Sequence, residues 1–230
     1  MGQKLGTGAL FSVLSGDMFR KRTTIEFSET GPAVVTINGI WNSRRASFDI
    51  NNFVKGVFGV DKATRVENGT TGVGDFLQIL GHEYLGTIDR PAIETAKAIR
   101  AGIAMKGEVY VVAHSQGTAI FNAALNLLSV ENRSKIHYIG VGAEWHIDAK
   151  SKGLASAENI WNKADKIPLA NRRPTGWLIP TLADRQLHTE WTKIDSSLNM
   201  TRKGNHHSFV YYREAVADWA KRMKDQMGSK

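Results

Sequence analysis

The sequence contains no cysteine, which excludes disulfide bonds, thiol nucleophiles and cysteine-based zinc sites. No apolar run approaches the roughly 18–20 residues that a membrane-spanning helix needs. The N-terminal stretch has only a weak apolar patch, which Gly16 and Asp17 interrupt, so we predict no signal peptide. The sequence predicts a soluble protein and leaves its location open between the cytoplasm and export as part of a larger polypeptide.

The positive charge is not gathered into a block. Lys and Arg number 30 against 22 acidic residues, a formal net charge of +8, but they are scattered along the chain. Neither an RNA-binding aromatic signature nor a zinc-finger spacing accompanies them, and the histidines show no metal-ligand spacing. Nucleic acid is therefore disfavoured as a partner, and the charge is typical of a solvated surface. The oligomeric state is left open.

No repeat or linker divides the chain. Its 230 residues, 42% of them hydrophobic, are enough for one substantial core. Residues 1–230 are therefore predicted to form a single domain. Within it, residues 1–31 are an N-terminal extension or strand that ends at the Gly31-Pro32 turn, and residues 168–200 are an irregular cap or loop excursion.

Strands alternate with helices along most of the chain. Apolar runs typical of buried strands are "AVVTING", "EVYVVA" and "KIHYIGVGA", with shorter strands at "ATRVEN" and "ENIWN". Helical periodicity is present at residues 47–59, after Gly74, at 89–106, at 116–129 and from Phe209 onward. In the first of these helices Phe48, Phe53, Val54 and Val57 are expected near one face. The alternation predicts a mostly parallel sheet with helices on both faces.

The stretch "AHSQG", residues 113–117, lies between a predicted strand and a predicted helix. It matches the G-x-S-x-G nucleophile elbow with alanine in the first glycine position. Such a sharp turn needs small neighbours two residues either side of the serine, and the following helix offers N–H groups to an oxyanion. Ser115 is the predicted nucleophile and Gln116 the first oxyanion donor. Ile40, after the tight turn at Asn38-Gly39, is the predicted second donor.

A serine nucleophile needs a base, and the base needs an orienting acid. In elbow-type hydrolases the chain order is serine, acid, histidine, with the acid after a late strand. Asp165 follows "ENIWN" and is the predicted acid. Asp148 and Glu144, one strand earlier, are the competing acids.

The base is expected in the loop before the final helix. His206 and His207 are adjacent there, whereas His146 and His188 fit the expected chain order less well. At least one of the adjacent pair is predicted to take the proton of Ser115.

Between Pro32 and Trp219 these motifs resemble those of bacterial lipase-like α/β-hydrolases. The resemblance is carried by "NGI", "AHSQG", "NKADKIP" and "HHSFVYY". It implies the α/β-hydrolase fold and a Ser-His-Asp triad. Related sequences mark the base with a His-Ser-aromatic-x-x-Tyr pattern, which favours His207 over His206. Some such domains are effector domains at the C-terminal end of secreted toxin polypeptides.

The expected reaction is hydrolysis of a carboxylic ester through an acyl-enzyme, which requires no metal or organic cofactor. The substrate is a lipid or a small ester. Trp177, Leu178 and Ile179 form an apolar stretch beside Arg172 and Arg173, typical of a loop that dips into lipid or of a satellite core strand. A peripheral membrane surface is a candidate partner. Soluble-ester esterases, thioesterases and peptidases share the same machinery, and the fold does not choose among them. The rival class is an inactive hydrolase-like protein or a basic protein that binds nucleic acid or membranes.

Overall fold

A computed structural model describes residues 23–39, 44–67, 90–143, 145–162, 192–194 and 208–228. Its strands are β1 (Ala33–Ile37), β2 (Thr64–Val66), β3 (Val109–His114), β4 (Ile136–Val141), β5 (Ser156–Asn162) and β6 (Thr192–Ile194). Its helices are α2 (Arg44–Phe58), α4 (Arg90–Lys106), α5 (Gly117–Leu125), α6 (Val130–Arg133), α7 (Ala149–Lys152), the 3-10 turn η4 (Phe209–Tyr212) and α10 (Arg213–Gly228).

The described strands form one sheet in the order β2-β1-β3-β4-β5-β6, and every pair in it is parallel. From β1 the chain steps outward to β2, returns to β3 on the other side of β1, and continues to β6. Ala33 lies opposite Val109, and Ile37 lies opposite Ala113. Ligands of open parallel sheets bind at the carboxyl ends of the two strands where the order reverses. A site is therefore expected where β1 and β3 end.

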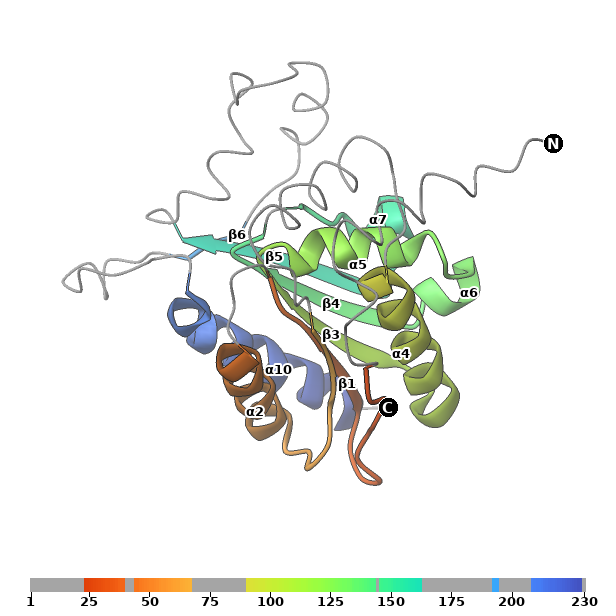
Figure 1. Cartoon of the computed structure of the whole chain (residues 1–230), viewed down its shortest axis with the longest axis horizontal. Helices are drawn as coiled ribbons and strands as arrows, with labels where there is room; N and C mark the ends of the chain where they lie inside the picture. Colours follow the sequence, from red (N-terminus) through yellow and green to blue (C-terminus); the bar gives the residue numbers. More distant parts are fainter. Residues whose placement is uncertain are drawn as a thin grey trace, which may run out of the picture.

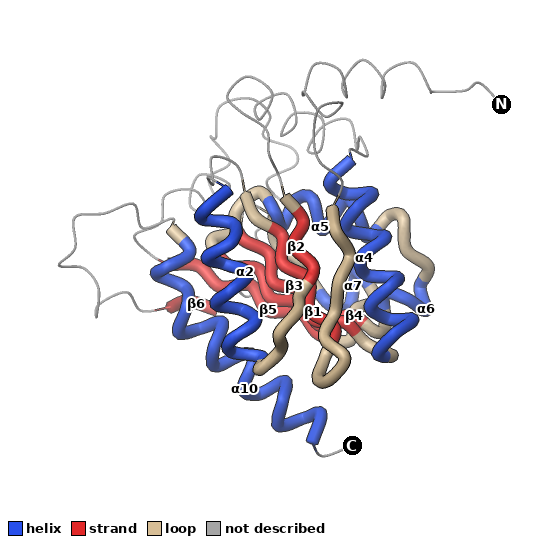
Figure 2. Tube along the Cα trace, turned by 60° about the horizontal axis from the view of Figure 1, so that its bottom comes forward, coloured by secondary structure: helices blue, strands red, loops and turns tan. Residues whose placement is uncertain are grey.

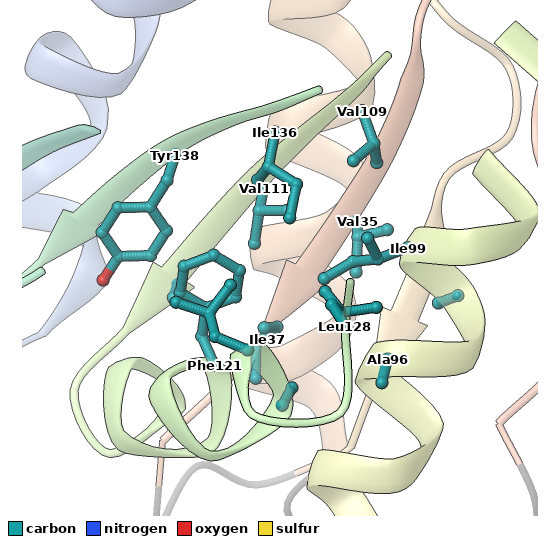
Figure 3. Close-up of a cluster of buried hydrophobic side chains, with 14 of the residues drawn as sticks. Val35, Ile37, Ala96, Ile99, Val109, Val111, Phe121, Leu128, Ile136 and Tyr138 are labelled. Atoms are coloured by element: carbon teal, nitrogen blue, oxygen red, sulfur yellow. The ribbon is translucent and has the colours of Figure 1, made fainter. Parts of the chain in front are cut away.

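Helices cover both faces of the sheet, as predicted (Figures 1 and 2). Helices α2 and α10 lie on one face, and α4 and α5 lie on the other. Strands β1 and β3 are buried at every position, because both of their faces are covered. Figure 3 shows part of the core on the α4–α5 side, where Ile99 and Phe121 reach toward the sheet. The ring of Phe121 stacks on Tyr138 with the ring centroids 4.4 Å apart.

The apolar repeat predicted for the C-terminal helix is confirmed. The residues of this repeat are all at most 5% exposed: Phe209, Tyr212, Val216, Trp219 and Met223. The ring centroid of Trp219 lies 5.8 Å from that of Phe58 and 6.2 Å from that of Tyr110. The helix therefore packs against both α2 and the sheet.

The core-facing side of α2 is predicted only in part. Val54 is buried, but Phe48 is 43% exposed, and the buried hydrophobic residues of α2 are Ile50, Val54 and Phe58 at a spacing of four residues. The guanidinium carbon of Arg65 lies 3.5 Å from the centroid of the Phe48 ring. This cation–π contact covers the ring without burying it in the core, which the apolar pattern alone does not reveal.

One further segment differs from the prediction, and another takes one of its two predicted forms. The segment 168–200, expected to be irregular, contributes β6, which pairs with β5 from Ile160 opposite Thr192. Three residues are too few to show a strand pattern. Residues 23–32 form the extension without a strand. The Thr64 hydroxyl accepts the N–H of Glu26 (3.0 Å) and donates to the Glu26 carbonyl (2.9 Å), so a side chain of β2 pairs both backbone groups of Glu26.

Several predictions fall outside the described residues: the extension up to residue 22, the helix after Gly74 and most of the segment 168–200. Among the helices that the structure describes, none combines the length and the apolar character needed to cross a bilayer.

Candidate active site

Ser115 occupies the sharp turn between β3 and α5. Its backbone φ is +56°, and in the described part of the chain it is the only non-glycine residue with a positive φ. This left-handed conformation costs about 1–2 kcal/mol, because Cβ crowds the following carbonyl oxygen. Strained residues of this kind persist where their surroundings over-determine them, and they cluster at functional sites. Ser115 therefore combines a left-handed backbone with a position between a strand and a helix.

Hydrogen bonds hold the backbone of Ser115 on both sides. Its N–H donates to the carbonyl oxygen of Val141 at 3.1 Å, which ties the turn to β4. Its carbonyl oxygen accepts from the Thr118 N–H at 3.0 Å and from the Thr118 hydroxyl at 2.8 Å. The strained residue is thereby fixed between the sheet and the first turn of α5.

Two glycines let β1 and α5 approach this turn closely. A Cβ atom on Gly39 would lie 2.5 Å from the Cβ of Ser115 and 2.8 Å from its Oγ. A Cβ atom on Gly117 would lie 2.5 Å from the carbonyl oxygen of Ile37. The small residue at 117 was predicted from the tightness of the turn itself. The structure adds β1 as the neighbour that requires it, and places the end of β1 against the Ser115 side chain.

The two predicted oxyanion donors are the sequence neighbours of these two glycines. Gln116 directly precedes α5 and already has a helical backbone, with φ −57° and ψ −20°. It is fully buried, at the end of α5 that carries the positive end of the helix dipole. Ile40 lies outside the described residues, but its neighbour Gly39 is in contact with Ser115. The structure therefore brings Ser115, Gln116 and the turn before Ile40 together.

Of the three candidate acids, the structure describes only Asp148. Its carboxylate accepts the N–H of Ser151 at 2.7 Å and caps the N-terminus of α7. Hydrogen bonding to Ser151 holds the pKa of Asp148 below its ordinary value. Asp148 therefore has a structural role as a helix cap. Glu144 and Asp165 lie outside the described residues, and Asp165 follows β5 in the sequence.

In the sequence, the predicted base comes just before η4. His206, His207 and the less favoured His188 are outside the described residues, which resume at Ser208. Phe209 and Tyr212 of η4 contact one side chain that sequence reasoning missed. This is the imidazole of His114, which is 2% exposed and has ring centroids 5.8 Å from Phe209 and 6.3 Å from Tyr212.

The alternation along β3 could have revealed His114. Tyr110 and Val112 face the core beside α10, and His114 continues the same side of the strand. The contacts of His114 place η4, which follows His206 and His207 in the sequence, beside the residue that directly precedes Ser115. Within the described ranges no three His, Asp or Glu side chains converge as metal ligands would.

No protein-family model and no curated protein matches the sequence. Solved structures are similar in fold. Lipase B of Aspergillus fumigatus is 13% identical over 85% of this chain and 53% of its own, with a TM-score of 0.50. A Trichoderma reesei cutinase is 16% identical over 93% of this chain and 88% of its own, with a TM-score of 0.48. An alpha/beta hydrolase enzyme from a sediment metagenome of the Mar Chica lagoon, Morocco, is 12% identical over 91% of this chain and 97% of its own, with a TM-score of 0.47.

The fold is that of the α/β-hydrolases. The parallel sheet, its helices on both faces and the similarity to lipase B agree on this architecture, which confirms the predicted fold class. The chain spans about half the length of lipase B, and at 13% identity the similarity shows the fold alone.

Closing the space between Gly39 and Ser115 tests the geometry. Gly39→Ala is expected to lower kcat/KM by about 10²–10³, as for loss of one oxyanion donor, because the new methyl group would displace the turn before Ile40. Steady-state kinetics on a soluble ester measures this. Gly56→Ala in α2 is the matched control, because its Cβ would have nothing within 4 Å. It should keep parent activity and gain up to about 1 kcal/mol of stability. Equal activity of both variants would contradict the contact.

Proposed function

We propose that the chain is a serine hydrolase that cleaves carboxylic esters. The observation that carries this proposal is the strained backbone of Ser115 at the carboxyl end of β3, with Gly39 against its side chain. That position is the switch point of a parallel sheet, where α/β enzymes bind their ligands. A serine in a strand–turn–helix elbow presents its hydroxyl above the sheet beside the N–H groups of the following helix.

The proposed mechanism assigns one role to each predicted residue. Ser115 Oγ attacks the ester carbonyl carbon while His207 accepts the hydroxyl proton, and Asp165 holds the imidazole in the required tautomer. The N–H groups of Gln116 and Ile40 stabilise the oxyanion. The tetrahedral intermediate expels the alcohol, which takes the proton from His207. Water, deprotonated by His207, then attacks the acyl-enzyme and releases the acid and free Ser115.

We propose a lipid-like ester at an interface as the substrate. Support comes from the similarity to a protein named as a lipase, from the net charge of +8 and from the apolar stretch at Trp177 flanked by arginines. Each large side chain buried in a bilayer contributes about 1.5–3 kcal/mol. Each arginine near an anionic surface adds about 1 kcal/mol, which salt screens. A role as the effector domain of a secreted toxin polypeptide is a further proposal, from sequence resemblance alone.

Acyl-chain profiling tests this function directly. p-Nitrophenyl esters of increasing chain length report soluble esterase activity, and anionic phospholipid vesicles report activity at an interface. The proposal predicts turnover of both, higher activity on vesicles, and a decrease of vesicle activity as salt increases. Activity confined to short soluble esters at all salt concentrations would reduce the proposal to a plain esterase.

The apolar stretch can be tested separately from the chemistry. Trp177→Ala combined with Leu178→Ser is expected to abolish most vesicle activity and to keep soluble-ester activity, because only interfacial binding loses apolar area. Val130→Ser is the matched control. Val130 is 68% exposed on α6, next to the amino end of β4, and should affect neither activity. Loss of both activities together with loss of folding would identify Trp177 and Leu178 as core residues.

A further inference from the structure

The hydroxyl of Thr118 joins two backbone groups beside the proposed nucleophile. Thr118 is completely buried in the first turn of α5. Its Oγ1 donates to the carbonyl oxygen of Ser115 at 2.8 Å and accepts the backbone N–H of Trp145 at 2.8 Å. One side chain therefore connects the loop after β4 with the strained turn after β3.

The peptide bond between Ser115 and Gln116 links the Thr118 hydrogen bond to the proposed oxyanion donor, the Gln116 N–H. The carbonyl of Ser115 and the N–H of Gln116 belong to the same planar trans peptide, so they point in opposite directions. Any group that fixes the direction of the Ser115 carbonyl therefore also fixes the direction of the Gln116 N–H. Thr118 donates two hydrogen bonds to that carbonyl, one from its backbone and one from its hydroxyl.

The Thr118 hydroxyl also makes the Gln116 N–H a stronger hydrogen-bond donor. The N–H of Trp145, the hydroxyl of Thr118 and the carbonyl of Ser115 form a chain of hydrogen bonds, and bonds in such a chain polarise one another. A polarised Ser115 carbonyl withdraws electron density from the Gln116 nitrogen, which makes its N–H a better donor. Low solvent access strengthens the effect, because Ser115 and Gln116 are both buried.

We propose that Thr118 is a positioning residue of the oxyanion hole. Its hydroxyl aims and polarises the Gln116 N–H, so its contribution appears in the transition state rather than in substrate binding. This inference rests on the proposed ester hydrolysis. The proposed role belongs to the Thr118 hydroxyl alone. Because that hydroxyl accepts the Trp145 N–H, the loop after β4 also supports catalysis.

Three substitutions separate this role from simple stability. Thr118→Val keeps the shape and removes the hydroxyl. Thr118→Ser keeps the hydroxyl and removes the methyl group. Thr64→Val is the matched control, because Thr64 is also completely buried and its hydroxyl also donates one hydrogen bond and accepts another, both with Glu26. Thr64 lies on β2, which β1 separates from β3.

The readouts are kcat and KM on a soluble ester, affinity for a boronic acid and thermal unfolding. Thr118→Val is expected to lower kcat about tenfold, below the 10²–10³ of a lost donor, with KM nearly constant. Affinity for the boronic acid, whose tetrahedral adduct places an oxygen in the oxyanion hole, should fall by a similar factor. Thr118→Ser should recover most of the lost kcat. Thr64→Val should unfold at a lower temperature with parent kcat.

Each outcome decides the inference. Parent kcat in Thr118→Val, or an equal loss in Thr118→Ser, overturns it and leaves the proposed function intact. A matching loss of kcat in Thr64→Val also overturns it, because the effect is then general destabilisation. If Thr118→Val does not fold, Thr118→Ala removes the same hydroxyl without crowding and is compared with Thr118→Ser. A parent protein that hydrolyses no ester overturns both the inference and the proposed function.

Discussion

Replacement of Ser115 by alanine is expected to abolish ester hydrolysis and to prevent labelling by a fluorophosphonate probe. Such a probe reacts with a serine oxygen that an adjacent base has activated. Removal of that oxygen leaves only binding and oxyanion stabilisation, and loss of a serine nucleophile reduces kcat by a factor on the order of 10⁶. Mass analysis of the labelled native protein should place the adduct on Ser115.

A second substitution at the same position tests the strain. Ser115→Gly should be as inactive as Ser115→Ala, but it should be more stable by up to about 1 kcal/mol. Glycine relieves the 1–2 kcal/mol cost of a left-handed residue with a Cβ, and part of this gain is offset by the greater entropy of the unfolded chain. Denaturant unfolding of the two variants measures the difference. Greater stability of the alanine variant would contradict the φ of +56°.

The control for both variants is a buried serine away from the site. Ser28 is 2% exposed, precedes β1, and donates a hydrogen bond to Asp61. Ser28→Ala should lose stability and keep both labelling and turnover. Labelling that persists in folded Ser115→Ala would end the assignment of Ser115 as nucleophile.

Much of the fold could be predicted because local pattern and burial agree. β1 and β3 are mostly apolar runs in the sequence and are fully buried in the structure. The repeat from Phe209 to Met223 likewise matches the buried side of η4 and α10. In such segments one face, or both, is covered along the whole length, so sequence periodicity reports burial directly.

The prediction failed where a contact depends on a distant part of the chain. The apolar pattern predicts that Phe48 packs in the core, but its ring lies at the surface under the side chain of Arg65. The three residues of β6 are a strand only because β5 offers an edge. The contact of Gly39 with Ser115 joins the ends of two strands, and no local pattern shows that these ends meet. Likewise, the link from Trp145 through Thr118 to Ser115 depends on how β4 and β3 align.

His207→Ala is expected to abolish turnover, whereas His206→Ala should keep most of it. Adjacent side chains point in different directions, so only one of the two can readily reach the Ser115 hydroxyl. The contacts of His114 with Phe209 and Tyr212 hold η4, the turn that follows the pair, beside β3. Without its base the serine stays protonated, and the loss should approach that of the Ser115 variants. Kinetics of both variants measure it, and the reverse result would move the role to His206.

We expect the same contrast in kcat between the two candidate acids, Asp165 and Asp148, with a smaller effect. Asp165→Asn is expected to lower kcat by a factor on the order of 10⁴, because an asparagine favours the wrong imidazole tautomer. Asp148→Asn is the matched control, since the carboxylate of Asp148 already accepts the Ser151 N–H and asparagine caps helices about as well as aspartate. Its kcat should stay near that of the parent. A larger loss in Asp148→Asn than in Asp165→Asn would mean that the helix cap and the catalytic acid are the same carboxylate. The acid would then lie after β4 rather than after β5.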